Sequence, residues 1–250
     1  MKLLHISDTH DIYTFDNITP CDVLCITGDW SPLKIQRDIQ ECYDWIKSSF
    51  IPTLAELLDK GVKNIVLIAG NHDFVSEDED FEEIFAKELS TRGLSDHIHY
   101  LCNSSVTIDG VRFYGCPCSD IRGWAWWSHN DKEHYTPPMD TDIMLVHQAP
   151  DIGTVGTSIT SNGHVHNFGS AILLDAIRYK TPKLLLCGHI HSGSHQPARF
   201  DGVFSSCIIV NGSILDEDYN VAYPPQAIDY EKVKGGKSRI NLGAQYSFVL

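Results

Sequence analysis

The sequence has few basic residues and no long hydrophobic run. Its 250 residues include 19 lysines and arginines against 33 aspartates and glutamates, so the net charge is −14 at pH 7. Binding to a long polyanion depends on basic side chains, and we therefore expect no long nucleic-acid partner. No apolar segment reaches the roughly 20 residues of a membrane-spanning helix, and the first residues lack the apolar core of a signal peptide. We expect a cytoplasmic protein without a membrane partner.

The sequence also lacks the cysteine pairs of a structural zinc site. Of its eight cysteines, Cys25 and Cys187 lie inside apolar runs, where cysteine behaves as a small hydrophobic residue. Cys116 and Cys118 have no second pair to complete four zinc ligands, so we expect reduced thiols. The composition shows no linker, and we expect a single domain over residues 1–250.

Five apolar runs, each followed by polar side chains, organise the chain. They span residues 2–7, 22–27, 64–69, 142–146 and 183–187. The polar residues that follow them are Asp8, His10, Asp29, Asn71, His147, His189 and His191. Continuous apolar runs with β-branched residues are typical of strands buried on both faces of a sheet. Because the carboxyl ends of such strands border one crevice in open α/β sheets, we expect these seven side chains to meet at one site.

Helical patterns separate some of these runs, which is typical of an α/β protein. Apolar residues recur at helical spacing over residues 33–58, with a break expected at Pro52, and over residues 81–89 and 169–179. Alternating patterns predict strands in residues 98–116, 193–211 and 246–250, and Asp109-Gly110 predicts a hairpin turn.

The seven polar side chains suit a pair of divalent metal ions. Asp29 is the natural bridge between the two ions, because it is the sole acid at the end of its strand. Asp8, His10 and His191 could complete one ion, and Asn71, His147 and His189 the other. Nitrogen and oxygen donors without a thiolate indicate manganese, iron, zinc or nickel. Such a pair activates a bridging hydroxide for attack on a phosphoryl group.

Two residues beside Asn71 are candidates for proton transfer. His72 is placed to protonate the leaving oxygen, although it could instead bind substrate without moving a proton. Asp73 could orient the His72 imidazole, or it could hold the loop or cap a helix.

In their order along the chain, these residues resemble the motifs of the calcineurin-like metallophosphoesterases. The motifs are Asp8-x-His10, Gly28-Asp29, Gly70-Asn71-His72-Asp73, His147 and Gly188-His189-x-His191. The resemblance implies a four-layer α/β/β/α sandwich of two mixed β-sheets flanked by helices. It also implies a binuclear metal site with the ligands named above.

Within that superfamily the chain is most similar to the small metallophosphoesterase-domain-containing proteins. The similarity rests on residues 113–117, 123–126 and 211–213. Members of that group are associated with hydrolysis of phosphodiesters, including cyclic nucleotides, usually with manganese. Where the group commonly has His-Gly-Pro-Pro, this chain has His147-Gln148-Ala149-Pro150. We therefore expect a different contour beside the second metal, and with it a different substrate.

We expect a metal-dependent phosphodiesterase that acts on a small phosphoester, with nucleotides among the candidates. A phosphomonoesterase or protein phosphatase would use the same motifs. A weakly catalytic binding module on this scaffold is a third hypothesis, but all seven ligands are present, which favours an enzyme. The sequence leaves the oligomeric state open.

Two further groups of residues have no assigned role at this stage. Trp124, Trp126 and Trp127 lie in a long loop over residues 117–140, where they could stack a nucleobase or serve structure. His164 and His166 precede a predicted helix and could line the crevice or lie in a solvated loop.

Overall fold

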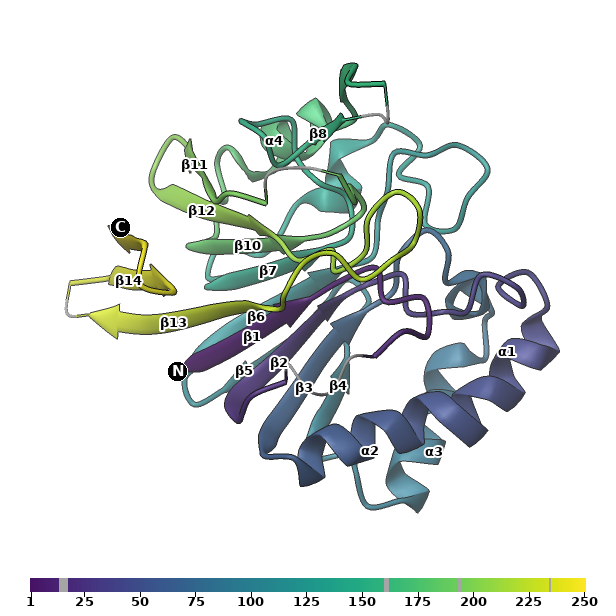
Figure 1. The fold of residues 1–250 in the computed structure, drawn as a ribbon. Helices are drawn as coiled ribbons and strands as arrows, with labels where there is room; N and C mark the ends of the chain where they lie inside the picture. Colours follow the sequence, from purple (N-terminus) through teal and green to yellow (C-terminus); the bar gives the residue numbers. More distant parts are fainter. Residues whose placement is uncertain (14–17, 160–161, 193–194, 234) are drawn as a thin grey trace.

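Two mixed β-sheets lie face to face in the computed structural model, which describes residues 1–250 except 14–17, 160–161, 193–194 and 234 (Figure 1). One sheet has seven strands in the order β15-β14-β13-β1-β2-β3-β4. Its parallel part consists of β1 (Lys2–Ile6), β2 (Cys21–Thr27), β3 (Val62–Ile68) and β4 (Ile98–Tyr100). Its antiparallel part consists of β13 (Gln226–Val233), β14 (Lys237–Leu242) and β15 (Tyr246–Val249).

The second sheet has six strands in the order β11-β12-β10-β7-β6-β5. Its four central strands are parallel: β6 (Val111–Cys116), β7 (Ile143–Val146), β10 (Leu184–Cys187) and β12 (Ser206–Asn211). The antiparallel edge strands are β5 (Ser104–Ile108) and β11 (Ala198–Asp201). A separate hairpin pairs β8 (Thr157–Ile159) with β9 (Val165–Asn167).

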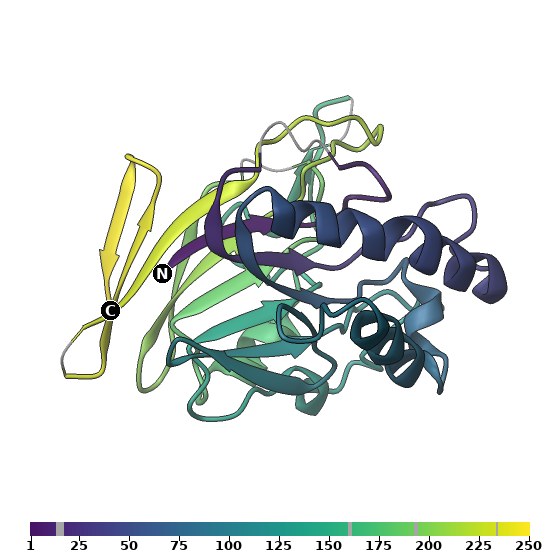
Figure 2. The same ribbon diagram turned by 90° about the horizontal axis from the view of Figure 1, so that it is seen from below.

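Helices cover the outer face of each sheet. The seven-stranded sheet is covered by α1 (Ile39–Trp45), a π-helical segment (Ile46–Phe50), α2 (Ile51–Asp59) and α3 (Phe81–Thr91), as Figures 1 and 2 show. The six-stranded sheet is covered by α4 (Ala171–Ile177) and a short 3₁₀ helix (Lys132–Tyr135). Another 3₁₀ helix (Phe74–Glu77) follows β3. This arrangement confirms the expected four-layer sandwich of two mixed sheets.

The continuous apolar runs pack on both faces of their strands. In β3, Val66 and Ile68 face the other sheet, whereas Ile65 and Leu67 face the helices. Successive side chains of a strand point to opposite faces, so a strand between two covered faces needs no polar positions. All eight cysteines are free thiols, and all except the partly exposed Cys102 are buried.

The helical region before β3 differs from our prediction in two ways. The first helix begins at Ile39 and not near Leu33, because Asp38 caps it by accepting a hydrogen bond from the Glu41 N–H at 3.0 Å. Pro52 does not break the helix, because the widened π-helical segment lies just before it. Proline removes one helical N–H and crowds the preceding turn, and a π-helical segment there relieves both effects.

The C-terminal strands β13 and β14 escaped our prediction. In β13, Ile228 and Tyr230 are buried while their neighbours are exposed, and the strand pairs antiparallel with β1. This short alternation is present in the sequence and would have predicted the strand. The predicted strands in residues 193–211 begin at Ala198, and residues 193–194 lie outside the described part. No helix in the described part is long and apolar enough to cross a membrane.

Candidate metal centre

The two sheets bring their polar strand ends together at one edge. Asp8, Asp29 and Asn71 follow β1, β2 and β3 of the seven-stranded sheet, and all three are buried. His147 follows β7 of the six-stranded sheet and is also buried, and His191 lies in the segment after β10. The crevice is therefore built between the ends of two facing sheets, whereas the prediction from strand ends required only one.

The backbone bends sharply where these side chains begin. Asp8, Asp29 and His189 have left-handed φ angles of 54°, 54° and 72°, which cost free energy for residues other than glycine. Gly188, before His189, permits a close approach to β1, since a Cβ atom there would collide with Ser7 Oγ and lie 2.5 Å from Asp8 Oδ2. Packing of the strand ends therefore holds the polar side chains in strained positions.

The first cluster consists of Asp8, His10 and His191, whose candidate ligand atoms lie within 4.8 Å of one another. His191 Nε2 is 3.3 Å from Asp8 Oδ1. His10 Nε2 is 4.0 Å from Asp29 Oδ2, and it is buried without a hydrogen-bond partner among the described residues. Buried polar atoms normally have a hydrogen-bond partner, and a histidine nitrogen that ligates a metal has none when the ion is absent. The position of His10 Nε2 therefore fits a metal ligand.

The second cluster is built around Asp29 and His147. His147 Nε2 is 3.3 Å from Asp29 Oδ2 and 2.9 Å from Asn71 Oδ1. The rings of His147 and His189 lie 5.1 Å apart, edge to face. Asp29 is thus close to both clusters, because it approaches His10 on one side and His147 on the other.

Hydrogen bonds at the far ring nitrogens orient three of the histidines. The Nδ1 atoms of His10, His147 and His191 lie 3.3, 2.8 and 3.0 Å from backbone carbonyl oxygens, to which Nδ1–H donates. Their Nε2 atoms then face carboxylate oxygens. A nitrogen lone pair and a carboxylate oxygen repel each other unless a cation or a proton lies between them.

The pKa values of two histidines also favour a cation at the site. Burial lowers the pKa of His147, but Asp29 and Asp8 more than offset it and raise the pKa to about 9. The pKa of His191 also rises to about 9, because Asp8 outweighs burial. These histidines therefore favour a positive charge at Nε2, and a divalent cation would supply it. The donor set fits two metal ions, and the ligand roles of the seven residues stay predictions.

His72 lies at the rim of the Asp29 cluster. Its Nε2 is 3.9 Å from Asp29 Oδ2, and its Nδ1 lies 2.5 Å from Gln36 Oε1. Burial lowers the pKa of His72 to about 4, although Asp29 acts in the opposite direction, so the imidazole is neutral near pH 7. Gln36 orients this ring, and the sequence contained no signal for it.

The predicted orienting role of Asp73 is not supported by its contacts. Its carboxylate accepts hydrogen bonds from the backbone N–H groups of Asp29, Ser31 and Gly70 at 2.7–2.8 Å, and from Trp30 at 3.4 Å. These bonds join the loops after β2 and β3. The alternative that Asp73 holds the loop therefore agrees with the structure.

Other residues around the centre were missed by sequence reasoning. The Ser213 hydroxyl donates to Asp8 Oδ2 at 2.6 Å, and the Tyr219 ring lies 5.2 Å from His10 and 5.4 Å from His191. Both follow β12, far along the sequence from their partners. By contrast, His164 and His166 are exposed near the β8–β9 hairpin, and the structure does not bring them among the seven residues.

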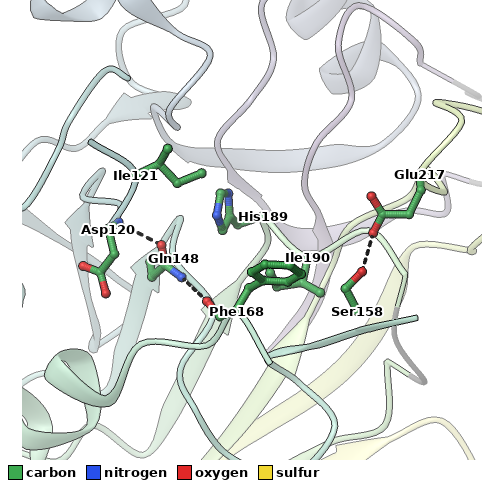
Figure 3. A pocket seen from close by; sticks show the side chains of 8 residues that line it. All are labelled: Asp120, Ile121, Gln148, Ser158, Phe168, His189, Ile190 and Glu217. Atoms are coloured by element: carbon green, nitrogen blue, oxygen red, sulfur yellow. Dashed lines mark hydrogen bonds between the residues drawn. The ribbon is translucent and has the colours of Figure 1, made fainter. Parts of the chain in front are cut away.

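A pocket of about 320 Å³ lies beside His189 (Figure 3). Gln148 lines it and is fully buried, with Oε1 accepting from the Asp120 N–H at 2.9 Å and Nε2 donating to the Phe168 carbonyl at 3.1 Å. Gln148 thus joins the long loop to the segment before α4. Gln148, which stands where the group commonly has glycine, therefore shapes the pocket beside His189. The different substrate expected from this departure stays a prediction.

Comparisons with known proteins agree with this geometry. The calcineurin-like phosphoesterase family model matches residues 1–193. Metallophosphoesterase domain-containing protein 1 of Homo sapiens is 24% identical over 249 residues, which cover 91% of this chain and 70% of that protein. UPF0046 protein C25E10.12 of Caenorhabditis elegans is 24% identical over 245 residues, with 92% and 80% covered.

Two further similarities extend these findings. Metallophosphoesterase YkoQ of Bacillus subtilis is 25% identical over 180 residues, which cover 66% of this chain and 61% of that protein. One solved structure matches with a TM-score of 0.61 at 12% identity, covering 100% of this chain and 98% of the other, which supports the fold. The family model covers most of the chain and every motif at the strand ends, and the chain therefore belongs to the calcineurin-like phosphoesterase family.

Proposed function

We propose that this protein is a phosphodiesterase that depends on two divalent metal ions. The observation that carries the proposal is the pair of carboxylate and imidazole clusters that share Asp29. Asp8, His10, Asp29 and His191 would hold one ion, and Asp29, Asn71, His147 and His189 the other. When bound, two such ions supply nucleophile activation and neutralise charge on the phosphoryl oxygens. Manganese is our first candidate, and a cytoplasmic location remains part of the proposal.

His72 is the proposed proton donor to the leaving oxygen. In the free protein its Nε2 faces Asp29 and the ring is neutral. An anionic phosphoryl group at Nε2 favours the protonated imidazole, which brings the pKa of His72 back toward neutrality. Gln36 at Nδ1 keeps the ring plane directed at the metal clusters.

The charges around the clusters favour a diester over a monoester. Among the described residues, Asp8 and Asp29 receive their hydrogen bonds and ion pairs from histidines, Ser213 and backbone groups, with no lysine or arginine. A monoester dianion brings one more negative charge than a diester and would gain no side-chain cation at the clusters.

Trp124 is the tryptophan best placed to contact an aromatic leaving group such as a nucleoside. Its ring lies 4.5 Å from the His72 ring, and the Arg37 guanidinium lies 5.1 Å from it on the exposed surface. Trp126 is less suitable, because its indole N–H donates to Ser76 Oγ at 2.7 Å and its ring packs on the core. The nucleotide substrate is therefore proposed with Trp124 as its stacking residue.

The test is hydrolysis of bis-p-nitrophenyl phosphate by metal-stripped protein, before and after manganese is restored. Restored diester cleavage that exceeds cleavage of the p-nitrophenyl monoester is the expected result. Asp29→Asn should lower kcat by more than the roughly 100-fold typical of outer partners of a metal ligand. Stronger monoester cleavage would indicate a phosphomonoesterase, and no cleavage with two bound ions would indicate a binding module.

A further inference from the structure

The pocket beside His189 is adjacent to the metal centre but takes no part in the function proposed so far. Eight residues line it: Asp120, Ile121, Gln148, Ser158, Phe168, His189, Ile190 and Glu217. His189 belongs to the second cluster, and Gln148 directly follows His147. Any group in this pocket would therefore lie next to a phosphoryl group held at the clusters.

The walls of the pocket are mainly apolar. Ile121 and Ile190 contribute aliphatic surface, and Phe168 contributes an aromatic ring (Figure 3). Gln148 has its amide committed to Asp120 and Phe168, so it shapes the pocket and offers little free hydrogen-bonding capacity. The walls suit a compact group with an apolar surface.

Glu217 supplies a fixed charge at the rim. Three donors, the Ser158 hydroxyl and the Ser192 N–H and hydroxyl, reach its Oε1 at 3.0, 3.1 and 2.6 Å. Figure 3 shows the carboxylate turned toward the cavity. No lysine or arginine is among the eight lining residues, and the described ion pairs include none with Glu217. The carboxylate is thus positioned by neutral donors and keeps its negative charge for a ligand.

We propose that this pocket binds the retained alcohol of the diester, and that this alcohol is a cationic amino alcohol of the choline or ethanolamine type. A carboxylate combined with an aromatic face and aliphatic walls is the environment that recognises alkylammonium groups. An anionic substituent would meet the Glu217 carboxylate, and a large polar one would meet apolar walls. The inference rests on the proposed phosphodiesterase and names one of its two ester groups.

The experiment compares two chromogenic diesters that share a leaving group. In p-nitrophenyl phosphorylcholine the retained alcohol is cationic, and in bis-p-nitrophenyl phosphate it is neutral. Glu217→Gln keeps an acceptor for the serine donors but removes the charge, and it should lower kcat/KM for the choline ester by about fivefold, the upper range for an exposed ion pair. Cleavage of the bis-aryl ester should be unchanged.

Glu231→Gln on β13 is the matched control, because it also removes one surface carboxylate but Glu231 is not among the residues that line the pocket. It should alter neither ester. Equal kcat/KM for the choline ester in wild type and Glu217→Gln, with normal bis-aryl cleavage, would overturn the pocket assignment alone. No diester cleavage by wild type would instead overturn the proposed function.

A binding measurement keeps the two conclusions separate. Saturation-transfer NMR should show contact between the methyl protons of phosphocholine and wild-type protein, and a weaker signal with Glu217→Gln. Phe168→Leu should also weaken it, because the aromatic face is lost while the apolar volume remains. Equal signals from all three proteins would contradict the proposal whatever the turnover results.

Discussion

At the scale of single residues, the metal centre depends on contacts that hold each side chain in one orientation. His10, His147 and His191 are each tied through Nδ1 to a backbone carbonyl, so Nε2 is the atom presented to the clusters. Residue type alone does not establish this orientation. It arises because segments from distant parts of the chain meet around each ring.

The role of His72 can be tested with leaving groups of different basicity. His72→Ala should slow diphenyl phosphate hydrolysis by roughly 100-fold, the lower range for loss of a general acid. Bis-p-nitrophenyl phosphate should be slowed far less, because p-nitrophenolate leaves readily without a proton. Steady-state kinetics of both esters measures the difference. Equal losses would show that His72 binds the phosphoryl group without transferring a proton.

Asp73 should affect stability more than its position beside His72 suggests. Asp73→Ala leaves several buried backbone N–H groups without an acceptor and should cost about 3 kcal/mol in the free energy of unfolding. Asp73→Asn retains one oxygen and should cost less. Urea unfolding measures both variants. An Asp73→Ala protein with unchanged stability and impaired turnover would restore the orienting role.

At the scale of elements, α1 offers a direct test of helix capping. The Asp38 side chain accepts the Glu41 N–H, and Asp38→Ala should lower the free energy of unfolding by about 1 kcal/mol. Asp80 occupies the N-cap position of α3 without a side-chain cap bond, and it is the matched control. Asp80→Ala should cost much less in the same urea titration. Similar losses in both would show that the cap bond is not the cause.

The long loop over residues 117–140 reaches the metal centre through Trp124. Trp124→Ala should lower kcat/KM for release of the nucleoside from a nucleoside 5′-(methyl phosphate) diester by roughly tenfold, since a base stacked on an aromatic side chain contributes about 1–3 kcal/mol. The small bis-aryl ester should change less. Trp126→Phe, which keeps the core packing but loses the bond to Ser76, is the control. An equal loss of kcat/KM on both esters would show that Trp124 does not stack on the base.

At the scale of the whole molecule, the two sheets share one hydrophobic interior. Val66 of the seven-stranded sheet and Phe113 of the six-stranded sheet belong to the same buried cluster. The single domain that we predict should therefore unfold as one cooperative unit.

Two probes on opposite outer faces can test this prediction. Trp30 is buried between the seven-stranded sheet and its helices, and Cys187 and Cys207 are buried on the helix-covered face of the six-stranded sheet. In a variant that keeps Trp30 as its only tryptophan and Cys187 and Cys207 as its only thiols, tryptophan fluorescence and thiol labelling should show coincident urea transitions. Separate midpoints would indicate two units that unfold independently.

Much of the fold was predictable because the strongest signals are local. The apolar runs that became β1, β2, β3, β7 and β10 are largely buried on both faces, so most of their residues are apolar and the pattern is easily recognised. The helix break at Pro52 was wrong because a π-helical segment compensates for proline in a way that local propensity does not reveal. The strand β13 was missed because its alternation is short.

The sequence by itself determined which kinds of ligand stand at the ends of the buried strands, since strand and turn follow from neighbouring residues. The residue pattern left open that two facing sheets bring these ends together. The family resemblance implied this arrangement, and the tertiary structure shows it. Only the tertiary structure placed Gln36 on His72, Ser213 on Asp8 and Glu217 at the rim of the pocket. The first two contacts join residues that are 36 and 205 positions apart in the sequence, and Glu217 lies at a cavity between loops. No local pattern encodes them, because they depend on how the completed sheets pack.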